Sequence, residues 1–174
     1  LLRALGIPCR FHGATIDKAL QRGAVTGLWF SLAPAEILHS WAEVWFDSKW
    51  VKLEGVILDN AYLGAVQRVV SKATQSAEGF IGYAIATQNI GKPDVEWKGC
   101  DTAIQQEGIA RDLGIYDSPD PFYAKYGVNM SPLKRLLFAQ FIRHRLNARV
   151  EKIRKGEATF DLDTLCASKR ISVQ

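Results

Sequence analysis

The 174-residue sequence is poor in the residues that build disulfide frameworks and metal sites. It has three histidines and three cysteines, and the cysteines lack CxxC spacing: Cys9, Cys100 and Cys166. An odd number of scattered thiols argues against a disulfide-bonded secreted domain, so we expect a reducing, cytoplasmic location. We expect no metal and no cofactor, because HExxH, GxSxG and a glycine-rich phosphate loop are missing.

Long apolar runs are also missing. None approaches the ~18 residues that a membrane-spanning helix needs, so we expect a soluble chain without a membrane partner. Extensive disorder is not expected, since hydrophobic residues make up 48% of the sequence and five tryptophans add large apolar side chains. The length fits one domain, or one domain with an appendage.

The sequence opens inside a helical pattern. Leu1, Leu2 and Leu5 are spaced as on an amphipathic helix, which ends at Gly6. About one and a half turns of helix are marginal in isolation, so we expect earlier turns to precede Leu1. Any targeting signal would lie there too.

The clearest strand runs from Leu38 to Phe46, where aromatic and β-branched residues alternate with small or polar ones. His39, Trp41 and Glu43 share one face of this strand. The segment Asp47-Ser48-Lys49 then predicts a turn into a second strand, Trp50 to Glu54, and hence a hairpin.

The register of this hairpin decides what His39 contacts. If Asp47 and Ser48 form a two-residue loop, Phe46 pairs with Lys49. Glu54 then lies opposite Trp41 and diagonal to His39, at ~7–8 Å between backbones, which long side chains span. A slip of one residue would place the two side chains on opposite faces.

The remaining segments give less specific patterns. Cys9–Thr15 alternates as a strand, and Phe80–Ile85 fits a strand or a packed loop. Helices are predicted over about 60–72, over Ala103–Arg111, before Gly127, and from the Ser131-Pro132 cap to Gly156.

Three segments together resemble the transglutaminase-like superfamily. They are Leu-Leu-Arg-Ala-Leu-Gly-Ile-Pro-Cys-Arg at 1–10, His-Ser-Trp-Ala-Glu-Val-Trp-Phe at 39–46 and Lys-Trp-Val-Lys-Leu-Glu at 49–54. The resemblance covers about the first third of the chain. It implies an α+β fold with a papain-like core, in which an antiparallel hairpin carries a catalytic histidine and its acid.

Residue by residue, the resemblance makes His39 the catalytic histidine and puts Glu54 where the family usually has aspartate. The nucleophilic cysteine of the family falls upstream of Leu1, outside this chain, so the chain by itself is expected to be inactive. Asp59 is a second candidate for the acid. Trp41, Glu43 and Trp50 are candidates to line the substrate cleft, although the tryptophans fit simple packing of the hairpin as well. His12 and His144 have no evident partners in the sequence.

The expected function is acyl transfer through a cysteine thioester, with a peptide or protein amide as substrate and either water or an amine as acceptor. The alternative is a non-catalytic binding or scaffold module of the same family. We expect a core over 1–98 and a helical C-terminal extension over 99–174 packed on it, similar to an extension of bacterial transglutaminase-like proteins. The extension carries a basic helix. We expect its cations to face solvent, and contact with nucleic acid is the less favoured interpretation. The cations are Lys134, Arg135, Arg143, Arg145, Arg149, Lys152, Arg154 and Lys155. The sequence gives no oligomeric state.

Overall fold

The computed structural model describes residues 1–73, 78–127, 140 and 143–160. Within these ranges the chain is α+β, with two antiparallel sheets and four α-helices. The strands are β1 (Cys9–Asp17), β2 (Glu36–Phe46), β3 (Lys49–Lys52), β4 (Glu78–Gly82), β5 (Ile85–Asn89) and β6 (Ile109–Tyr116). The helices are α1 (Leu28–Leu32), α2 (Asn60–Ala73), α3 (Pro119–Tyr126) and α5 (Arg143–Lys155). No helix of the described ranges is long and apolar enough to cross a membrane.

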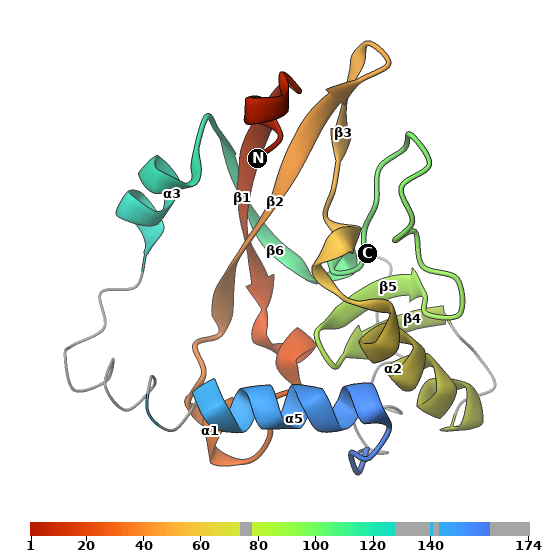
Figure 1. Ribbon diagram of the computed structural model, residues 1–174. Helices are drawn as coiled ribbons and strands as arrows, with labels where there is room; N and C mark the ends of the chain where they lie inside the picture. Colours follow the sequence, from red (N-terminus) through yellow and green to blue (C-terminus); the bar gives the residue numbers. More distant parts are fainter. Residues whose placement is uncertain (74–77, 128–139, 141–142, 161–174) are drawn as a thin grey trace.

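The larger sheet has the order β3-β2-β1-β6 and is antiparallel throughout. Figure 1 shows it as a curled sheet, with the tip of the β2–β3 hairpin at the top, α3 on the left and α5 across the bottom. β1 and β2 pair along the whole of β1, from Cys9 opposite Val44 to Asp17 opposite Glu36. The two central strands therefore form the frame on which the candidate site is built.

The β2–β3 hairpin has the two-residue loop on which contact between His39 and Glu54 depends. Phe46 pairs with Lys49, and Glu43 pairs with Lys52. The two loop residues Asp47 and Ser48 have φ angles of 48° and 60°, the left-handed pair that matches the twist of a two-residue hairpin. The even-numbered residues of β3, and Glu54 just beyond its end, therefore lie on the same face of the sheet as His39.

This turn allows a direct test of the register. Left-handed backbone is unfavourable for residues with a Cβ atom, and Asn-Gly is the preferred pair in this kind of turn. The double change Asp47→Asn with Ser48→Gly should raise the free energy of unfolding by about 0.5–1 kcal/mol. Urea titration measures the change. A loss of stability would show that the strands do not pair through a two-residue loop in solution.

The main hydrophobic core lies below the larger sheet, between α2, α5 and the β4–β5 hairpin. α2 begins after Asp59, whose carboxylate accepts a hydrogen bond from the Tyr62 backbone N–H at 2.8 Å and caps the helix. The residues that α2 buries recur at helical spacing: Tyr62, Leu63, Val66 and Val70. This core also contains Tyr83 of the β4–β5 turn and Ile153 of α5.

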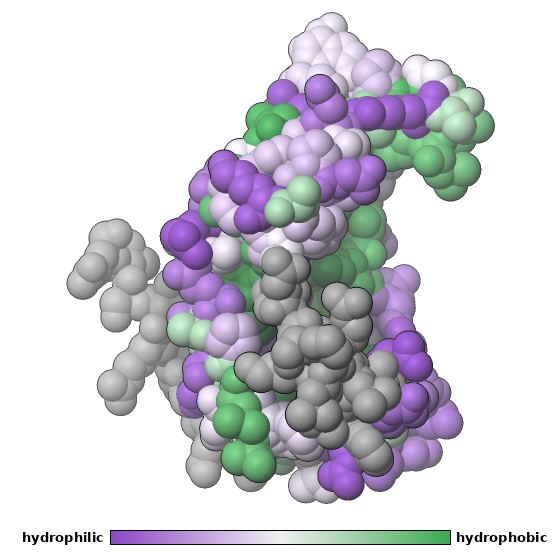
Figure 2. All heavy atoms as spheres, turned by 90° about the vertical axis from the view of Figure 1, so that its left-hand side faces the viewer, coloured by the Kyte–Doolittle hydropathy of each residue, from purple (hydrophilic) through white to green (hydrophobic). Residues whose placement is uncertain are grey.

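Helix α3 packs on the face of β1 that carries Phe11 and Gly13. Pro119 occupies its first turn and Gly127 follows its last residue. Its Phe122 is fully buried and lies so close to Gly13 of β1 that a Cβ atom there would come within 2.2 Å of the ring. On this side of the molecule, hydrophobic surface shows at the upper end and in a recess at mid-height (Figure 2).

The structure corrects part of the sequence prediction. The helix expected over Ala103–Arg111 is wrong: a 3₁₀ turn over Gln106–Gly108 leads directly into β6, which pairs with β1. The segment around Phe80–Ile85 forms two paired strands, β4 and β5. Because β6 lies beyond residue 98, the larger sheet crosses the expected boundary, and the division into a core over 1–98 and an extension over 99–174 stays a prediction.

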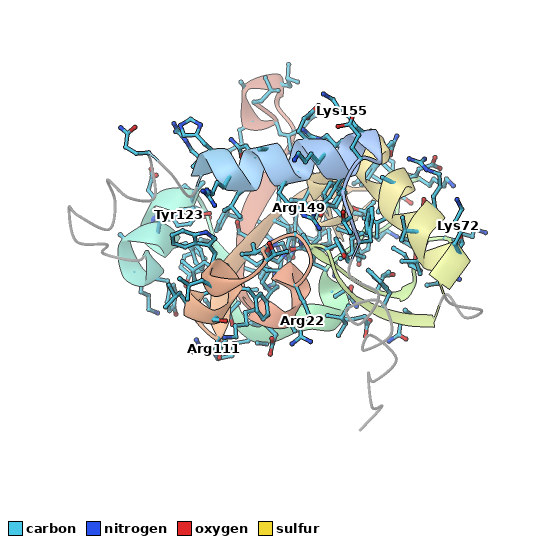
Figure 3. All side chains as sticks on the ribbon, turned by 90° about the horizontal axis from the view of Figure 1, so that it is seen from below. Arg22, Lys72, Arg111, Tyr123, Arg149 and Lys155 are labelled. Atoms are coloured by element: carbon cyan, nitrogen blue, oxygen red, sulfur yellow. The ribbon has the colours of Figure 1, made fainter. Side chains whose placement is uncertain are left out.

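The basic helix is described only from Arg143 onward; its predicted first half, with the Ser131 cap, Lys134 and Arg135, lies outside the described residues. Two of its cations bind groups outside the helix. Arg149 points from α5 toward the interior (Figure 3) and donates to the carbonyls of Gly23 and Thr159. Arg154 pairs with Asp59 at 2.7 Å. These two arginines therefore hold α5 in place.

Candidate functional site

His39 and Glu54 form a buried pair. The Nε2 atom of His39 lies 3.1 Å from Oε1 of Glu54, and the two side chains are 4% and 0% exposed. Glu54 follows the end of β3 and reaches diagonally across the sheet, as the hairpin register requires. An ionised carboxylate only accepts hydrogen bonds, so Nε2 carries the proton. Nδ1 has no hydrogen-bond partner among the described residues.

Backbone amides hold the carboxylate of Glu54. The N–H groups of Ile104 and Gln105 donate to it at 2.5 and 3.1 Å. The side chain of Gln105 in turn donates to the Ala84 carbonyl at 2.7 Å. The segment that supplies these amides runs parallel to the end of β3, where Leu53 and Thr102 form a bridge. Glu54 is thereby fixed from the main chain, which satisfies a buried charge that would otherwise be costly.

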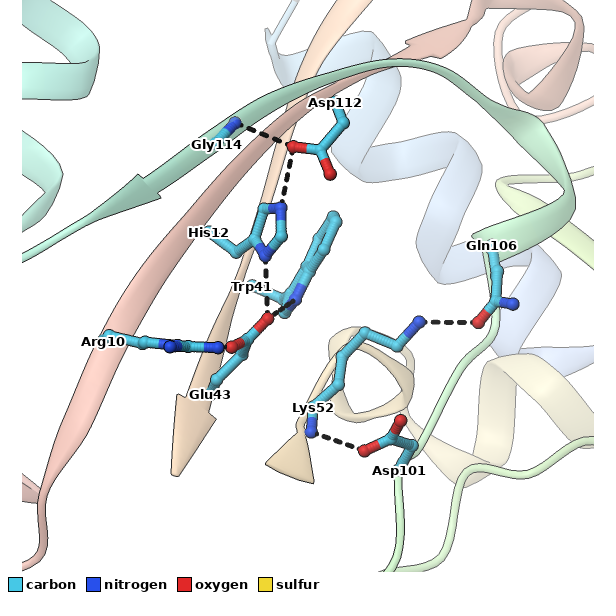
Figure 4. Close-up of polar contacts among 9 residues, drawn as sticks. All are labelled: Arg10, His12, Trp41, Glu43, Lys52, Asp101, Gln106, Asp112 and Gly114. Atoms are coloured by element: carbon cyan, nitrogen blue, oxygen red, sulfur yellow. Dashed lines mark hydrogen bonds and ion pairs between the residues drawn. The ribbon is translucent and has the colours of Figure 1, made fainter. Parts of the chain in front are cut away.

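Trp41 lies between this pair and a second polar cluster, which Figure 4 shows together with Trp41. Its ring centroid lies 5.6 Å from that of His39 and 4.3 Å from that of His12, on which it stacks. Its indole N–H donates to Glu43 at 3.3 Å. His12, Trp41 and His39 thus form a row of rings along one face of β1 and β2.

Glu43 lies at the centre of this second cluster. One of its oxygens is 2.7 Å from Nδ1 of His12 and the other accepts from Nε of Arg10 at 2.6 Å. The other ring nitrogen of His12 is 2.9 Å from Asp112 on β6. An imidazolium donates to both carboxylates, whereas a neutral ring donates to only one. His12 therefore joins three strands of the sheet, β1, β2 and β6.

A cleft of about 420 Å³ opens over this cluster. It is lined by side chains of the curled sheet and of the segment before β6: Arg10, His12, Trp41, Glu43, Trp50, Lys52, Asp101, Gln106, Ile109 and Asp112. The three residues proposed from the sequence as cleft residues, Trp41, Glu43 and Trp50, all line it. His39 does not line it and contacts it through Trp41.

Residues 1–55 match the transglutaminase-like superfamily. The resemblance expected from the sequence is confirmed over this transglutaminase-like segment, which includes β1, the β2–β3 hairpin, His39 and Glu54. No curated protein and no solved structure matches the chain.

Other residues proposed from the sequence lie elsewhere. Asp59 caps α2 and pairs with Arg154, so of the two candidate acids Glu54 is the one that bonds to His39. Cys9 pairs with Val44, and its side chain lies on the face of β1 opposite to that of His12. Cys100 is exposed. Neither described cysteine shares the face on which the transglutaminase-like segment carries His39.

The view that His12 lacks partners is wrong. Its partners Glu43 and Asp112 are 31 and 100 residues away in the sequence. The alternation of Arg10 and His12 along the first strand was the one signal for this side of the cluster, because it places both on one face. Nothing in the transglutaminase-like segment indicates Asp112, Asp101 or Gln106. Among the described residues, no group of three or more His, Cys, Asp or Glu side chains is arranged to hold a metal ion.

The cluster shifts the titration of two carboxyl groups. Burial of Glu43 opposes its ionisation, but hydrogen bonds from His12, Arg10 and Trp41 outweigh this effect and lower its pKa below the ordinary 4.5. Bonds from His12 and from the Gly114 backbone lower the pKa of Asp112. Both groups are therefore ionised at neutral pH and accept hydrogen bonds there.

These shifts predict a loss of stability in acid. A carboxyl group with a lowered folded-state pKa stabilises the fold above its unfolded pKa, and this contribution disappears as the pH falls through the folded value. The free energy of unfolding should therefore fall from about pH 5 to pH 3, with about 1 kcal/mol of the fall removed by Glu43→Gln. Urea titrations across this range test the prediction. Glu157→Gln, the same change at an exposed position, is the control; an equal effect there would contradict a specific role of Glu43.

Proposed function

We propose that this chain is the histidine-and-acid part of a cysteine enzyme that transfers the acyl group of an amide. The buried hydrogen bond between His39 and Glu54, within the transglutaminase-like segment, carries the proposal. The core would have a papain-like arrangement. The nucleophile would be a cysteine at the start of a helix that precedes Leu1.

The geometry of His39 suits this chemistry. Glu54 holds Nε2 and so fixes the ring orientation and its tautomer. Nδ1 is then the nitrogen available to a thiol, whose proton it would take or whose thiolate it would stabilise as an imidazolium. Glutamate in place of the usual aspartate fits the diagonal reach from the end of β3, since it has the longer side chain.

The proposed reaction has two steps. The thiolate attacks the amide carbonyl, the C–N bond breaks, and His39 gives its proton to the leaving amine as a thioester forms. Water or an amine then attacks the thioester, His39 takes its proton, and the thiolate leaves. A peptide or protein amide is the proposed substrate, with either acceptor compatible with the residues described.

The test uses the natural protein that includes the segment before Leu1. We expect it to release ammonia or amine from glutamine-containing peptides and peptide anilides, and iodoacetamide to abolish this activity by modifying a cysteine upstream of Leu1, mapped by mass spectrometry. The chain 1–174, alkylated in parallel, is the inactive control. Amide cleavage that survives alkylation would overturn the proposal. An upstream segment without cysteine would favour a non-catalytic module of the same family.

A further inference from the structure

The cleft beside His39 contains two cations with unused hydrogen-bond donors. Lys52 extends from β3 over the ring of Trp41, with its ammonium 5.6 Å from the ring centroid. This ammonium donates to the side-chain oxygen of Gln106 at 2.6 Å (Figure 4). It forms no ion pair with any carboxylate in the described part of the chain. A lysine has three N–H donors, so two remain for a ligand.

Arg10 provides the second cation. Its Nε bonds to Glu43 at 2.6 Å, and its guanidinium lies 4.3 Å from the ring centroid of Trp50. The two terminal nitrogens of Arg10 have no partner among the residues that the structure describes. They keep the planar pair of donors that matches a carboxylate.

Arg10 and Lys52 lie on either side of Glu43. Arg10 pairs with Glu43 between β1 and β2, and Lys52 pairs with Glu43 between β2 and β3. Neighbouring strands are about 4.8 Å apart, so the backbone positions of Arg10 and Lys52 are about 10 Å apart, and both side chains leave the same face of the sheet. Both side chains line the cleft on this face, one on each side of Glu43.

Glu43 pairs with Arg10, but the carboxylates of the cleft leave the ammonium of Lys52 and the terminal nitrogens of Arg10 without a carboxylate partner among the described residues. Glu43 is saturated by Arg10, His12 and Trp41. Asp112 is 68% exposed, with His12 as its partner. Asp101 is exposed and accepts from the backbone N–H of Lys52 at 2.9 Å. The cleft therefore contains the unused donors of Lys52 and Arg10, and its unused carboxylate oxygens belong to the exposed Asp101 and Asp112.

We propose that this cleft binds a carboxylate of the substrate, so that the preferred amide substrate carries an acidic side chain next to the amide that reacts. Lys52 and Arg10 bind the carboxylate, and Trp41 and Trp50 contact its aliphatic part. Trp41 links the cleft to His39, since its ring contacts both. The inference rests on the proposed function for the reaction, but the binding itself needs no nucleophile.

The test measures binding of three small probes of similar shape to the chain 1–174. They are the α-amides of N-acetylglutamate, N-acetylglutamine and N-acetyllysine, and the readouts are tryptophan fluorescence and chemical-shift changes. We expect the glutamate probe to bind about tenfold more tightly than the neutral glutamine probe at low salt, because a charge-assisted hydrogen bond replaces a neutral one. Only the glutamate affinity should fall when the salt is raised to about 0.2 M.

Variants locate the binding. Lys52→Gln should weaken the glutamate probe about tenfold, and Lys52→Arg should restore most of the affinity because it keeps the charge and the donors. Lys49→Gln is the matched control, since this lysine lies on β3 but does not line the cleft.

Three results would each overturn the proposal: equal affinity for the glutamate and glutamine probes, tighter binding of the lysine probe, or equal effects of the changes at positions 52 and 49. The salt dependence of the unmodified chain decides the matter if the Lys52 variants fail to fold. If the natural protein cleaves amides but the glutamate probe shows none of the expected preference, the carboxylate subsite is wrong and the proposed function is unaffected.

Discussion

Replacement of His39 by alanine is expected to lower kcat/KM of the natural protein for amide cleavage by at least about 10³-fold, because general acid–base help and activation of the thiol are lost together. The side chain is 4% exposed and is held by Glu54. Because Nε2 is bonded to Glu54, His39 can act only through Nδ1, the nitrogen that would face the proposed nucleophile. Steady-state kinetics with a peptide amide measure the effect.

Two further variants separate catalysis from folding. His144→Ala removes an exposed histidine of α5 and should leave kcat/KM unchanged. Glu54→Asp, the residue that the family usually carries here, should keep a measurable part of the activity, because the orienting carboxylate remains. Full activity of a folded His39→Ala protein would contradict the assigned role of this histidine.

The largest expected effect on stability comes from Glu54→Ala. This change leaves three buried donors without an acceptor, on His39, Ile104 and Gln105. Removing one partner of a buried charged network costs about 3–5 kcal/mol, which is a large part of the stability of a typical domain. Thermal and urea unfolding of the chain 1–174 measure the loss.

Glu54→Gln tests whether the charge or the shape matters. Glutamine has the same length but presents an NH₂ group to donors that need an acceptor, so we expect a loss of about 1–3 kcal/mol. Glu157→Ala, at an exposed position, should change the free energy of unfolding by less than about 0.5 kcal/mol. Equal stability of Glu54→Ala and the unmodified chain would show that the backbone amides find other acceptors.

Local patterns in the sequence were sufficient to predict the β2–β3 hairpin. The alternation around Trp41 gave the strand, and the short loop at Asp47-Ser48 gave the register that brings His39 to Glu54. The sequence also predicted α2, as a helix over about 60–72, and α3, as a short helix that follows a turn and stops at Gly127. In each of these elements the deciding interactions lie within a few residues along the chain or across one tight turn.

β6 was missed because its deciding interactions are remote. Its residues Ile109–Tyr116 alternate poorly, and two irregularities interrupt its pairing with β1. The strand exists because β1 offers a free edge about one hundred residues earlier in the sequence. The same distance concealed the contact between His12 and Asp112, and with it the four cleft residues that lie beyond residue 98 in the sequence. The functional roles of His39 and Glu54 stay predictions.

The way in which Glu54 is anchored affects how such proteins can diverge. Its carboxylate is held by the main-chain amides of Ile104 and Gln105, and every amino acid except proline supplies such an amide. Positions 104 and 105 are thus free to drift in side-chain identity as far as this contact is concerned. Proline is the exception, because at either position it would remove one of the amides that hold the acid beside its histidine.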